Sequence, residues 1–294
     1  MAINAFPRAR PPHYTITLFC FHPFRCILEC QGRTQNTVRF CALASGSTGN
    51  AALIATASTR ILIDAGLSMR ELGRRLATIG ETLESIDAIV VTHEHSDHVS
   101  GLPVLARSKK VRATIYMTRL TAPSIDWGGA APKLETFQAG ARFVVGDIAV
   151  ESFSVPHDAL DPVGYAFEAC GVRIGVVTDL GYVPESIKYH LRRTDLLMLE
   201  ANHDLDMLKV GPYPWAVKQR VMSRVGHLSN LSMSDYLAGD LDRSTTYLVL
   251  GHLSEQNNHP EIARMVAQQT LEGRGLTTRL SIAAPHAPTE VYAF

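Results

Sequence analysis

Residues 87–98 read Asp-Ala-Ile-Val-Val-Thr-His-Glu-His-Ser-Asp-His, an apolar run that passes directly into three histidines and an aspartate. The β-branched segment from Ala88 to Val91 predicts a short buried strand, and the residues from His98 to Leu102 are typical of the first turn of a helix. The polar cluster is therefore expected on the loop between them. Neutral imidazoles and a carboxylate are suitable ligands for cations such as zinc, manganese or iron.

The four polar side chains of this loop are expected to face two different points. His93 and His95 can point the same way in an extended segment, whereas Asp97 and His98 lie beyond the bend and can face a second point nearby. One short loop can thus offer ligands to two metal ions. A solvated loop that is merely rich in histidine is the alternative, but the spacing is far more specific than any one of its residues.

The composition is that of a globular protein with a full hydrophobic core. The chain has 294 residues, of which 46% are hydrophobic, and no apolar run approaches the length of a membrane-spanning helix. Its formal net charge is zero, so any attraction to nucleic acid must come from a local patch of cations. We expect one compact αβ domain with a tail, and no membrane association.

The first 37 residues differ from the rest of the chain. They contain prolines and arginines, and their apolar stretch lacks the small-residue cleavage site of a signal peptide. A clean strand begins at Val38. We therefore expect residues 1–37 to be a poorly ordered or non-native extension, and residues 38–294 to form the folded domain.

The five cysteines do not form a disulfide framework. Their number is odd, and Cys20, Cys26 and Cys30 all lie in the N-terminal segment. This favours a reducing, cytoplasmic location. A zinc knuckle built from these three cysteines is disfavoured because their spacing includes no Cys-x-x-Cys pair.

The turn Ser45-Gly-Ser-Thr-Gly-Asn50 offers contacts for an anionic substrate. Its glycines permit a close approach of the backbone, and its amides and hydroxyls can hold an anion. The candidate contacts are Ser45, Ser47 and Asn50. A plain glycine hairpin turn is an equal alternative.

A second candidate substrate surface begins at Tyr213 and Trp215 and continues into a helix that carries Arg220 and Arg224. Aromatic and basic side chains suit a stacked base and a phosphate backbone. Arginines that cover apolar surface and a packed tryptophan are the alternative. The residues expected on the buried face of this helix are Val217, Val221 and Val225.

Later strands also end in polar residues. The predicted strand over residues 172–177 is followed by Asp179, and the apolar run that starts at Asp195 ends in Glu200 and His203. A carboxylate at the mouth of a buried strand costs desolvation free energy unless it is paired or bound to a metal, which makes Asp179 a predicted ligand. An Asx turn is the alternative. Glu200 and His203 are candidates for supporting the site or facing the substrate.

Together these stretches closely resemble the metallo-β-lactamase superfamily, and within it the YycJ/WalJ-like branch. The resemblance covers about residues 38–294 and rests on the segments that begin at Ser45, His93, Leu199, Gly211, Gly226 and His252. It implies an α/β (α+β) fold, namely a four-layer αββα sandwich, without the inserted β-CASP domain of larger nucleases.

The resemblance also implies the metal ligands. One ion would be held by His93, His95 and His157, and a second by Asp97, His98 and His252, with Asp179 between them. Asp64 and Glu200 would orient these ligands.

Catalytic and substrate roles follow from the same resemblance. His227 would contact the scissile phosphate, Asp97 would be required for catalysis, and Asn202 and His203 would face the substrate. For His227 or His252 taken alone, a helix-capping or core histidine is the alternative.

The implied activity is that of a dinuclear metal-dependent phosphodiesterase that digests DNA from 5′ to 3′. A hydroxide shared by two ions of zinc or manganese, with iron also admissible, would attack the phosphate. A hydrolase of small esters, thioesters or lactones is the alternative, although Cys170 lies away from every ligand motif and cannot be the cysteine ligand of several lactamases. The expected partner is nucleic acid, DNA first, in a cytoplasmic DNA-repair setting. A homodimer is left open.

Overall fold

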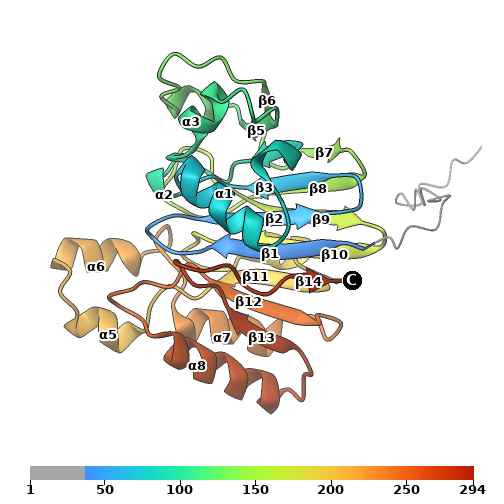
Figure 1. Cartoon of the computed structure of the whole chain (residues 1–294). Coiled ribbons are helices and arrows are strands. Elements are labelled where there is room, and N and C mark those ends of the chain that lie inside the picture. Colours follow the sequence, from blue (N-terminus) through green and yellow to red (C-terminus); the bar gives the residue numbers. More distant parts are fainter. Residues whose placement is uncertain (1–36) are drawn as a thin grey trace, which may run out of the picture. The chain divides into compact units, whose positions relative to one another are not determined.

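The computed structural model describes residues 37–294, which belong to a single unit (Figure 1). The expected N-terminal extension, apart from Thr37, and the cysteine knuckle fall on residues 1–36 and lie outside the described residues. Within residues 37–294, no helix is both long and apolar enough to span a membrane.

The described strands form two seven-stranded sheets. The first sheet has the order β14-β1-β2-β3-β4-β5-β6, with β1 (Arg39–Ala44), β2 (Ala51–Ala55), β3 (Arg60–Ile63), β4 (Ala88–Val90), β5 (Thr114–Thr118), β6 (Leu134–Phe137) and β14 (Tyr292–Ala293). The second has the order β13-β12-β11-β10-β9-β8-β7, with β7 (Arg142–Val145), β8 (Ile148–Ser154), β9 (Val163–Ala169), β10 (Val172–Val177), β11 (Leu196–Glu200), β12 (Tyr247–Gly251) and β13 (Arg279–Ile282).

Helices connect these strands, and most of them cover the outer faces of the two sheets (Figure 1). They are α1 (Met69–Thr78), α2 (Ser96–Val99), α3 (Leu102–Arg107), α4 (Glu185–His190), α5 (Leu205–Val210), α6 (Trp215–Val221), α7 (Asn230–Gly239) and α8 (Pro260–Gly273).

Three hydrophobic layers hold the helices and sheets together. Along β11, Leu196 and Met198 belong to the core between the two sheets, whereas Leu197 and Leu199 pack with the helices outside the second sheet. A third layer joins the first sheet to α1 and α3. Strands covered on both faces must be apolar on both faces, which explains the continuous apolar runs in the sequence. The predicted four-layer αββα sandwich is confirmed.

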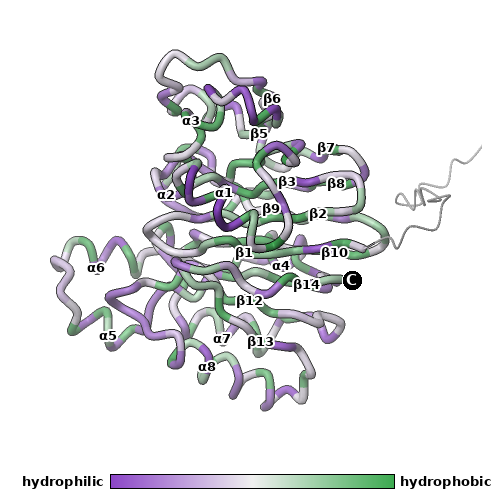
Figure 2. Tube along the Cα trace, in the orientation of Figure 1, coloured by the Kyte–Doolittle hydropathy of each residue, from purple (hydrophilic) through white to green (hydrophobic). Residues whose placement is uncertain are grey.

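Helices α1 and α8 are amphipathic, and Figure 2 shows hydrophobic and hydrophilic residues alternating along both. Ala263, Ala267 and Leu271 recur every four residues as the buried side of α8. Helix α1 begins after the N-cap Ser68, whose side chain accepts a hydrogen bond from the Glu71 N–H, and the chain turns away at Gly80, where φ is 76°.

The parallel strands decide where the polar clusters meet. β3 is parallel to β4 in one sheet, and β10, β11 and β12 are mutually parallel in the other. Their carboxyl ends therefore lie at one edge of each sheet, and the polar residues that end or follow these strands are brought to that edge. These residues are Asp64, His93, Asp179, Glu200 and His252.

The prediction for the helix after Trp215 was wrong. α6 ends at Val221, and Val217 and Val225 are exposed rather than buried, because the covered position of this helix is Lys218, whose ammonium donates to the Lys209 carbonyl. Helix α1 also has a buried cationic residue. Arg75 is buried and donates to the carbonyls of Leu43 and Pro285.

Candidate metal centre

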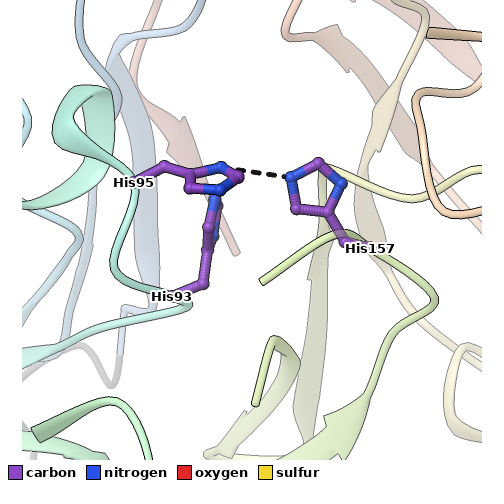
Figure 3. Close-up of side chains that lie close together, drawn as sticks. All are labelled: His93, His95 and His157. Carbon is purple, nitrogen blue, oxygen red and sulfur yellow. Dashed lines mark hydrogen bonds between the residues drawn. The ribbon is translucent and has the colours of Figure 1, made fainter. Parts of the chain in front are cut away.

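The first ligand group consists of His93, His95 and His157, whose candidate ligand atoms all lie within 4.8 Å of one another. His93 and His95 come from the loop between β4 and α2, and His157 faces them from the loop after β8 (Figure 3). The Nδ1 of His95 lies 3.3 Å from Nε2 of His157. Two atoms about 2.0–2.2 Å from one tetrahedral zinc ion lie about 3.3–3.6 Å apart, so this spacing suits two ligands of one ion.

The second ligand group consists of Asp97, His98 and His252. The Oδ2 of Asp97 lies 3.5 Å from Nε2 of His98 and 3.4 Å from Nε2 of His252. These distances again suit ligands that share one ion. Asp97 in α2 and His252 directly after β12 are 155 positions apart in the sequence, and the meeting of the two sheet edges brings them together.

Asp179 lies between the two groups. Its Oδ2 is 3.3 Å from Nε2 of His98, and its Oδ1 is 4.0 Å from Nε2 of His157. It also belongs to the cluster of His93 and His98 and to that of His227 and His252. A carboxylate in this position can contribute one oxygen to each of two ions.

Buried atoms without partners support metal binding at this site. Among residues 37–294, Nε2 of His93 and Oδ2 of Asp179 are fully buried and make no hydrogen bond. An unpaired buried polar atom costs about 1–3 kcal/mol, and more if it is charged, so such atoms normally have a partner. Burial and the neighbouring His98 lower the pKa of His93 well below its usual value, which keeps the ring neutral and available as a ligand. The residues present fit two divalent cations.

Hydrogen bonds to Nδ1 fix the orientation of three histidines. The Nδ1 of His98 donates to Asp64 Oδ2 at 2.8 Å, and that of His157 donates to the Gly226 carbonyl at 3.1 Å. The Nδ1 of His252 donates to Glu200 Oε1 at 3.0 Å. Carboxylate and carbonyl oxygens only accept, so the proton is on Nδ1 in each ring. Each Nε2 is left with a lone pair that points toward the ligand groups.

Glu200 is the main support on the second sheet. It is completely buried, and its Oε1 accepts hydrogen bonds from Nδ1 of both His227 and His252, while Oε2 accepts the N–H groups of Leu180 and Leu228. Burial alone would raise the pKa of Glu200, but the two histidines lower it to about 2. Asp64 and Glu200 therefore both lie behind candidate ligand histidines, within hydrogen-bond distance of their Nδ1 atoms.

Three of these strand-end residues have strained backbones. Asp64, Asp179 and His252 have φ angles of 59°, 58° and 54°, in a region that residues other than glycine rarely adopt. Such strain persists only where the surrounding structure enforces it, and it is concentrated at functional sites. Here it turns each side chain from its strand end into the ligand cluster.

The Ser45–Asn50 turn supports the site instead of offering a general anion pocket. Ser45 is fully buried and its hydroxyl accepts the His252 N–H at 2.8 Å. The Nδ2 of Asn50 donates to Asp97 Oδ2 at 3.1 Å. The predicted substrate contacts of Ser45 and Asn50 are therefore corrected, because their polar atoms already hold metal-ligand candidates. Ser47, the third predicted contact, is exposed.

The segment after Glu200 is also less accessible than predicted. Asn202 is buried and donates to the His252 carbonyl at 2.9 Å, so it positions that histidine and does not face a substrate. His203 is buried, and neither of its ring nitrogens has a hydrogen-bond partner among the described residues. Burial lowers the pKa of His203 to about 4, which keeps the ring neutral.

The aromatic and basic residues around α6 lie at the surface. Trp215 is 62% exposed, Tyr213 is partly buried, and Arg220 pairs with Asp158. Two further residues beside the site, Asp158 and Thr92, were not among the predicted ones. The Thr92 hydroxyl contacts Asp64 and lies 3.0 Å from Nδ1 of His93. Thr92 directly precedes His93 and Asp158 directly follows His157 in the sequence, and this adjacency to predicted ligands could have identified both residues.

Comparison with known families identifies the chain. A profile described as "Beta-lactamase superfamily domain" matches residues 59–249. The chain belongs to this superfamily. The predicted membership is confirmed, and so is the narrower resemblance to its YycJ/WalJ-like branch.

Relatives in this superfamily cover most of the chain. Exodeoxyribonuclease YycJ of Bacillus anthracis is 38% identical over 241 residues, which is 81% of this chain and 90% of YycJ. Exodeoxyribonuclease WalJ of Streptococcus pneumoniae is 38% identical over 232 residues, 77% of this chain and 86% of WalJ.

The superfamily fold is also seen in solved structures. The metallo-β-lactamase fold protein YhfI from Bacillus subtilis aligns with a TM-score of 0.69 and 16% identity over 88% of this chain and all of YhfI. Zinc-bound PqqB from Methylobacterium extorquens aligns with a TM-score of 0.64 and 19% identity over 85% of this chain and 99% of PqqB. At these identities the structures establish the fold alone.

Proposed function

We propose that this superfamily member is a metal-dependent exodeoxyribonuclease that digests DNA from the 5′ end. The observation that carries the proposal is the 38% identity to exodeoxyribonuclease YycJ over 90% of that protein. The geometry agrees, because both ligand groups and the intervening Asp179 are assembled at one site.

Two divalent cations, zinc or manganese, would supply a water of lowered pKa and neutralise the charge of the phosphate. The side chains that would hold them are His93, His95 and His157 for one ion and Asp97, His98 and His252 for the other, with Asp179 shared. Imidazole and carboxylate ligands suit either metal, and the imidazole-rich first group favours zinc there.

His227 is the proposed group that acts on the substrate. Its Nδ1 is held by Glu200 at 2.8 Å, and its ring lies between those of His157 and His252, with ring centroids 5.1 and 5.3 Å away. Because Glu200 occupies Nδ1, Nε2 is the nitrogen left for the substrate. Burial lowers the pKa of His227, but the Glu200 carboxylate outweighs this and raises the pKa above its usual value, which favours a ring protonated on both nitrogens. The side chain of His227 is 21% exposed, so its Nε2–H can donate a proton to the leaving oxygen as the phosphodiester bond breaks.

The DNA strand is proposed to leave the site over α5 and α6, which project beyond the sheets in Figure 1. Trp215 offers an exposed ring for base stacking, with Tyr213 beside it in the sequence, and Arg220 offers a charge for a phosphate. Ser47 is the remaining candidate for the terminal phosphate. We place this activity in the cytoplasm. Cys41 is a free thiol, and thiols stay reduced in that compartment, where DNA is also present.

A hydrolase of small esters or thioesters is the second candidate. Hydroxyacylglutathione hydrolase of a Methylobacterium species is 35% identical, but over only 106 residues and 38% of its own length. The same ligand groups would serve such a substrate. The longer match to the exodeoxyribonucleases favours DNA.

Digestion of end-labelled nucleic acid tests the proposal. Metal-free protein is reloaded separately with zinc, manganese or magnesium and incubated with 5′- and 3′-labelled single- and double-stranded DNA and RNA. We expect nucleotides to be released from the 5′ end of DNA, and Asp97→Ala to abolish release while leaving the circular dichroism spectrum unchanged. Turnover of thioesters or lactones without any cleavage of nucleic acid would contradict the proposal and favour the second candidate.

A further inference from the structure

Asp158 follows the ligand candidate His157, and its two carboxylate oxygens have different surroundings. Oδ2 accepts a hydrogen bond from Nε of Arg220 on α6. Oδ1 is buried, lies 3.4 Å from Nε2 of His157, and has no hydrogen-bond partner among the described residues. The carboxylate therefore lies between the first histidine group and an arginine at the surface.

Arg220 keeps most of its hydrogen-bonding capacity in this contact. A guanidinium has five N–H donors, and within residues 37–294 only Nε of Arg220 is engaged. The side chain is 61% exposed. Its two Nη groups thus form a free fork, which is the geometry that binds a phosphate through two parallel hydrogen bonds.

Backbone hydrogen bonds join the segment after α6 to the metal centre. The Asp158 N–H donates to the Val225 carbonyl at 3.0 Å, and Nδ1 of His157 donates to the neighbouring Gly226 carbonyl at 3.1 Å. The His227 N–H donates to the Val221 carbonyl at 2.9 Å. The helix that carries Arg220 is therefore tied at its C-terminal end to residues of the site.

We propose that Asp158 is a positioning residue, which holds the guanidinium of Arg220 beside the first histidine group as a clamp for a phosphate of the bound strand. This inference rests on the proposed nuclease function. Without Asp158, the long side chain of Arg220 gains rotamer freedom that phosphate binding must then remove. Asp158 acts through Arg220, and the metal content of the protein does not depend on it.

A double-mutant cycle on the metal-loaded enzyme tests this inference. KM and kcat are measured on an oligodeoxynucleotide for the wild type, Asp158→Ala, Arg220→Ala and the double variant, over a range of NaCl concentrations. Arg220→Ala is expected to raise KM about tenfold with little change in kcat, and to weaken the salt dependence by about one phosphate contact. Asp158→Ala is expected to raise KM several-fold when Arg220 is present and to add nothing in the Arg220→Ala background.

Three further measurements separate positioning from structural support. Asp158→Asn, whose amide oxygen can still accept from Nε, is expected to recover part of the affinity lost in Asp158→Ala. Arg264→Ala removes another exposed arginine paired with a carboxylate, that of Glu261, and is expected to leave KM unchanged. Elemental analysis is expected to give every variant the metal content of the wild type.

Two results would overturn the inference: loss of metal on replacing Asp158, or an equal rise in KM in both backgrounds. Either would show that Asp158 supports the metal centre and not the arginine. If the wild type itself digests no DNA, the nuclease proposal fails and this inference fails with it. If the wild type digests DNA but Asp158 and Arg220 are not coupled, the inference alone is wrong.

Discussion

The Nδ1 of His98 lies 2.8 Å from Oδ2 of Asp64, a residue 34 positions earlier in the chain. Asp64 follows β3 directly, and its Oδ1 also accepts the N–H of Thr92 at 2.8 Å, just after β4. One buried carboxylate thus joins two neighbouring strand ends and fixes the proton of His98 on Nδ1. The lone pair on Nε2 is thereby directed to the second ligand group.

Removing this carboxylate should weaken the second metal site more than the fold. Asp64→Ala is expected to reduce the affinity for the second ion by about 10- to 100-fold, since His98 loses the partner that holds its ring and tautomer. Titration of metal-free protein with zinc measures the change. Asp206→Ala, on an exposed aspartate of α5, is the matched control. An unaltered zinc affinity in Asp64→Ala would show that His98 is oriented by other contacts.

Replacing His227 separates metal binding from turnover. His227 is not in either three-residue ligand group, so His227→Ala is expected to keep the wild-type metal content while kcat falls by about a hundredfold to ten-thousandfold through loss of the proton donor. Elemental analysis and digestion of labelled DNA measure the two effects. His286→Ala, at a histidine that is 75% exposed, should leave both unchanged. Full activity in His227→Ala would remove this histidine from the mechanism.

The ligand cluster was predictable because each of its parts is local. An apolar run that ends in histidines or acids indicates a strand and the position of its carboxyl end. Parallel pairing brings the carboxyl ends of such strands to one edge of the sheet. His98 and Asp179 could be located in this way from sequence alone, whereas the supporting role of Asp64 was assigned by family resemblance. The roles assigned to His157, His227 and His252 came from family resemblance, since a single histidine after a strand is not specific.

Supporting contacts could not be predicted because they join distant segments. Asn50 reaches Asp97 across 47 positions, and Arg220 reaches Asp158 across 62. Nothing in the turn around Asn50 distinguishes a residue that holds a ligand from one that holds a substrate. The buried face of α6 was mispredicted for a similar reason. The spacing of Val217 and Val221 fits a helix, but a helix at the edge of the fold has little to pack against.

The acid stability of the protein should depend in part on Glu81, which is buried and accepts hydrogen bonds from Arg39 on β1 and Arg60 on β3. Burial raises the pKa of this carboxyl, but the two arginines outweigh it and lower the pKa below its usual value. A depressed pKa stabilises the fold above the pKa of the unfolded state, about 4.3, and this stabilisation is lost as the pH falls through the folded-state value.

Glu81→Gln is therefore expected to lower the free energy of unfolding by about 1–3 kcal/mol at pH 7, with a difference from the wild type that shrinks below about pH 4. Urea unfolding at a series of pH values measures this. Glu84→Gln, at a neighbouring carboxylate that is 52% exposed, is expected to have little effect at any pH. A difference for Glu81→Gln that stays constant down to pH 3 would contradict this account.

Gly66 tests how closely the second metal site is packed. A Cβ at this position would lie 1.6 Å from the Asp97 carbonyl oxygen and 2.7 Å from the Asn50 nitrogen, and both atoms belong to backbone that cannot move aside independently. The Asn50 N–H donates to that same Asp97 carbonyl at 2.7 Å, so one added methyl group would push the Asn50 turn and the Asp97 backbone away from each other.

We expect Gly66→Ala to lower the free energy of unfolding by about 3 kcal/mol or more and to lose the second ion before the first. Gly239→Ala, at a helix position where a Cβ meets no atom within 4 Å, is the control and should be neutral or slightly stabilising. Asp97 is not a member of the first histidine group, so that group should keep its ion. A metal content that falls by half, and not to zero, would identify the second group as a separate ion site.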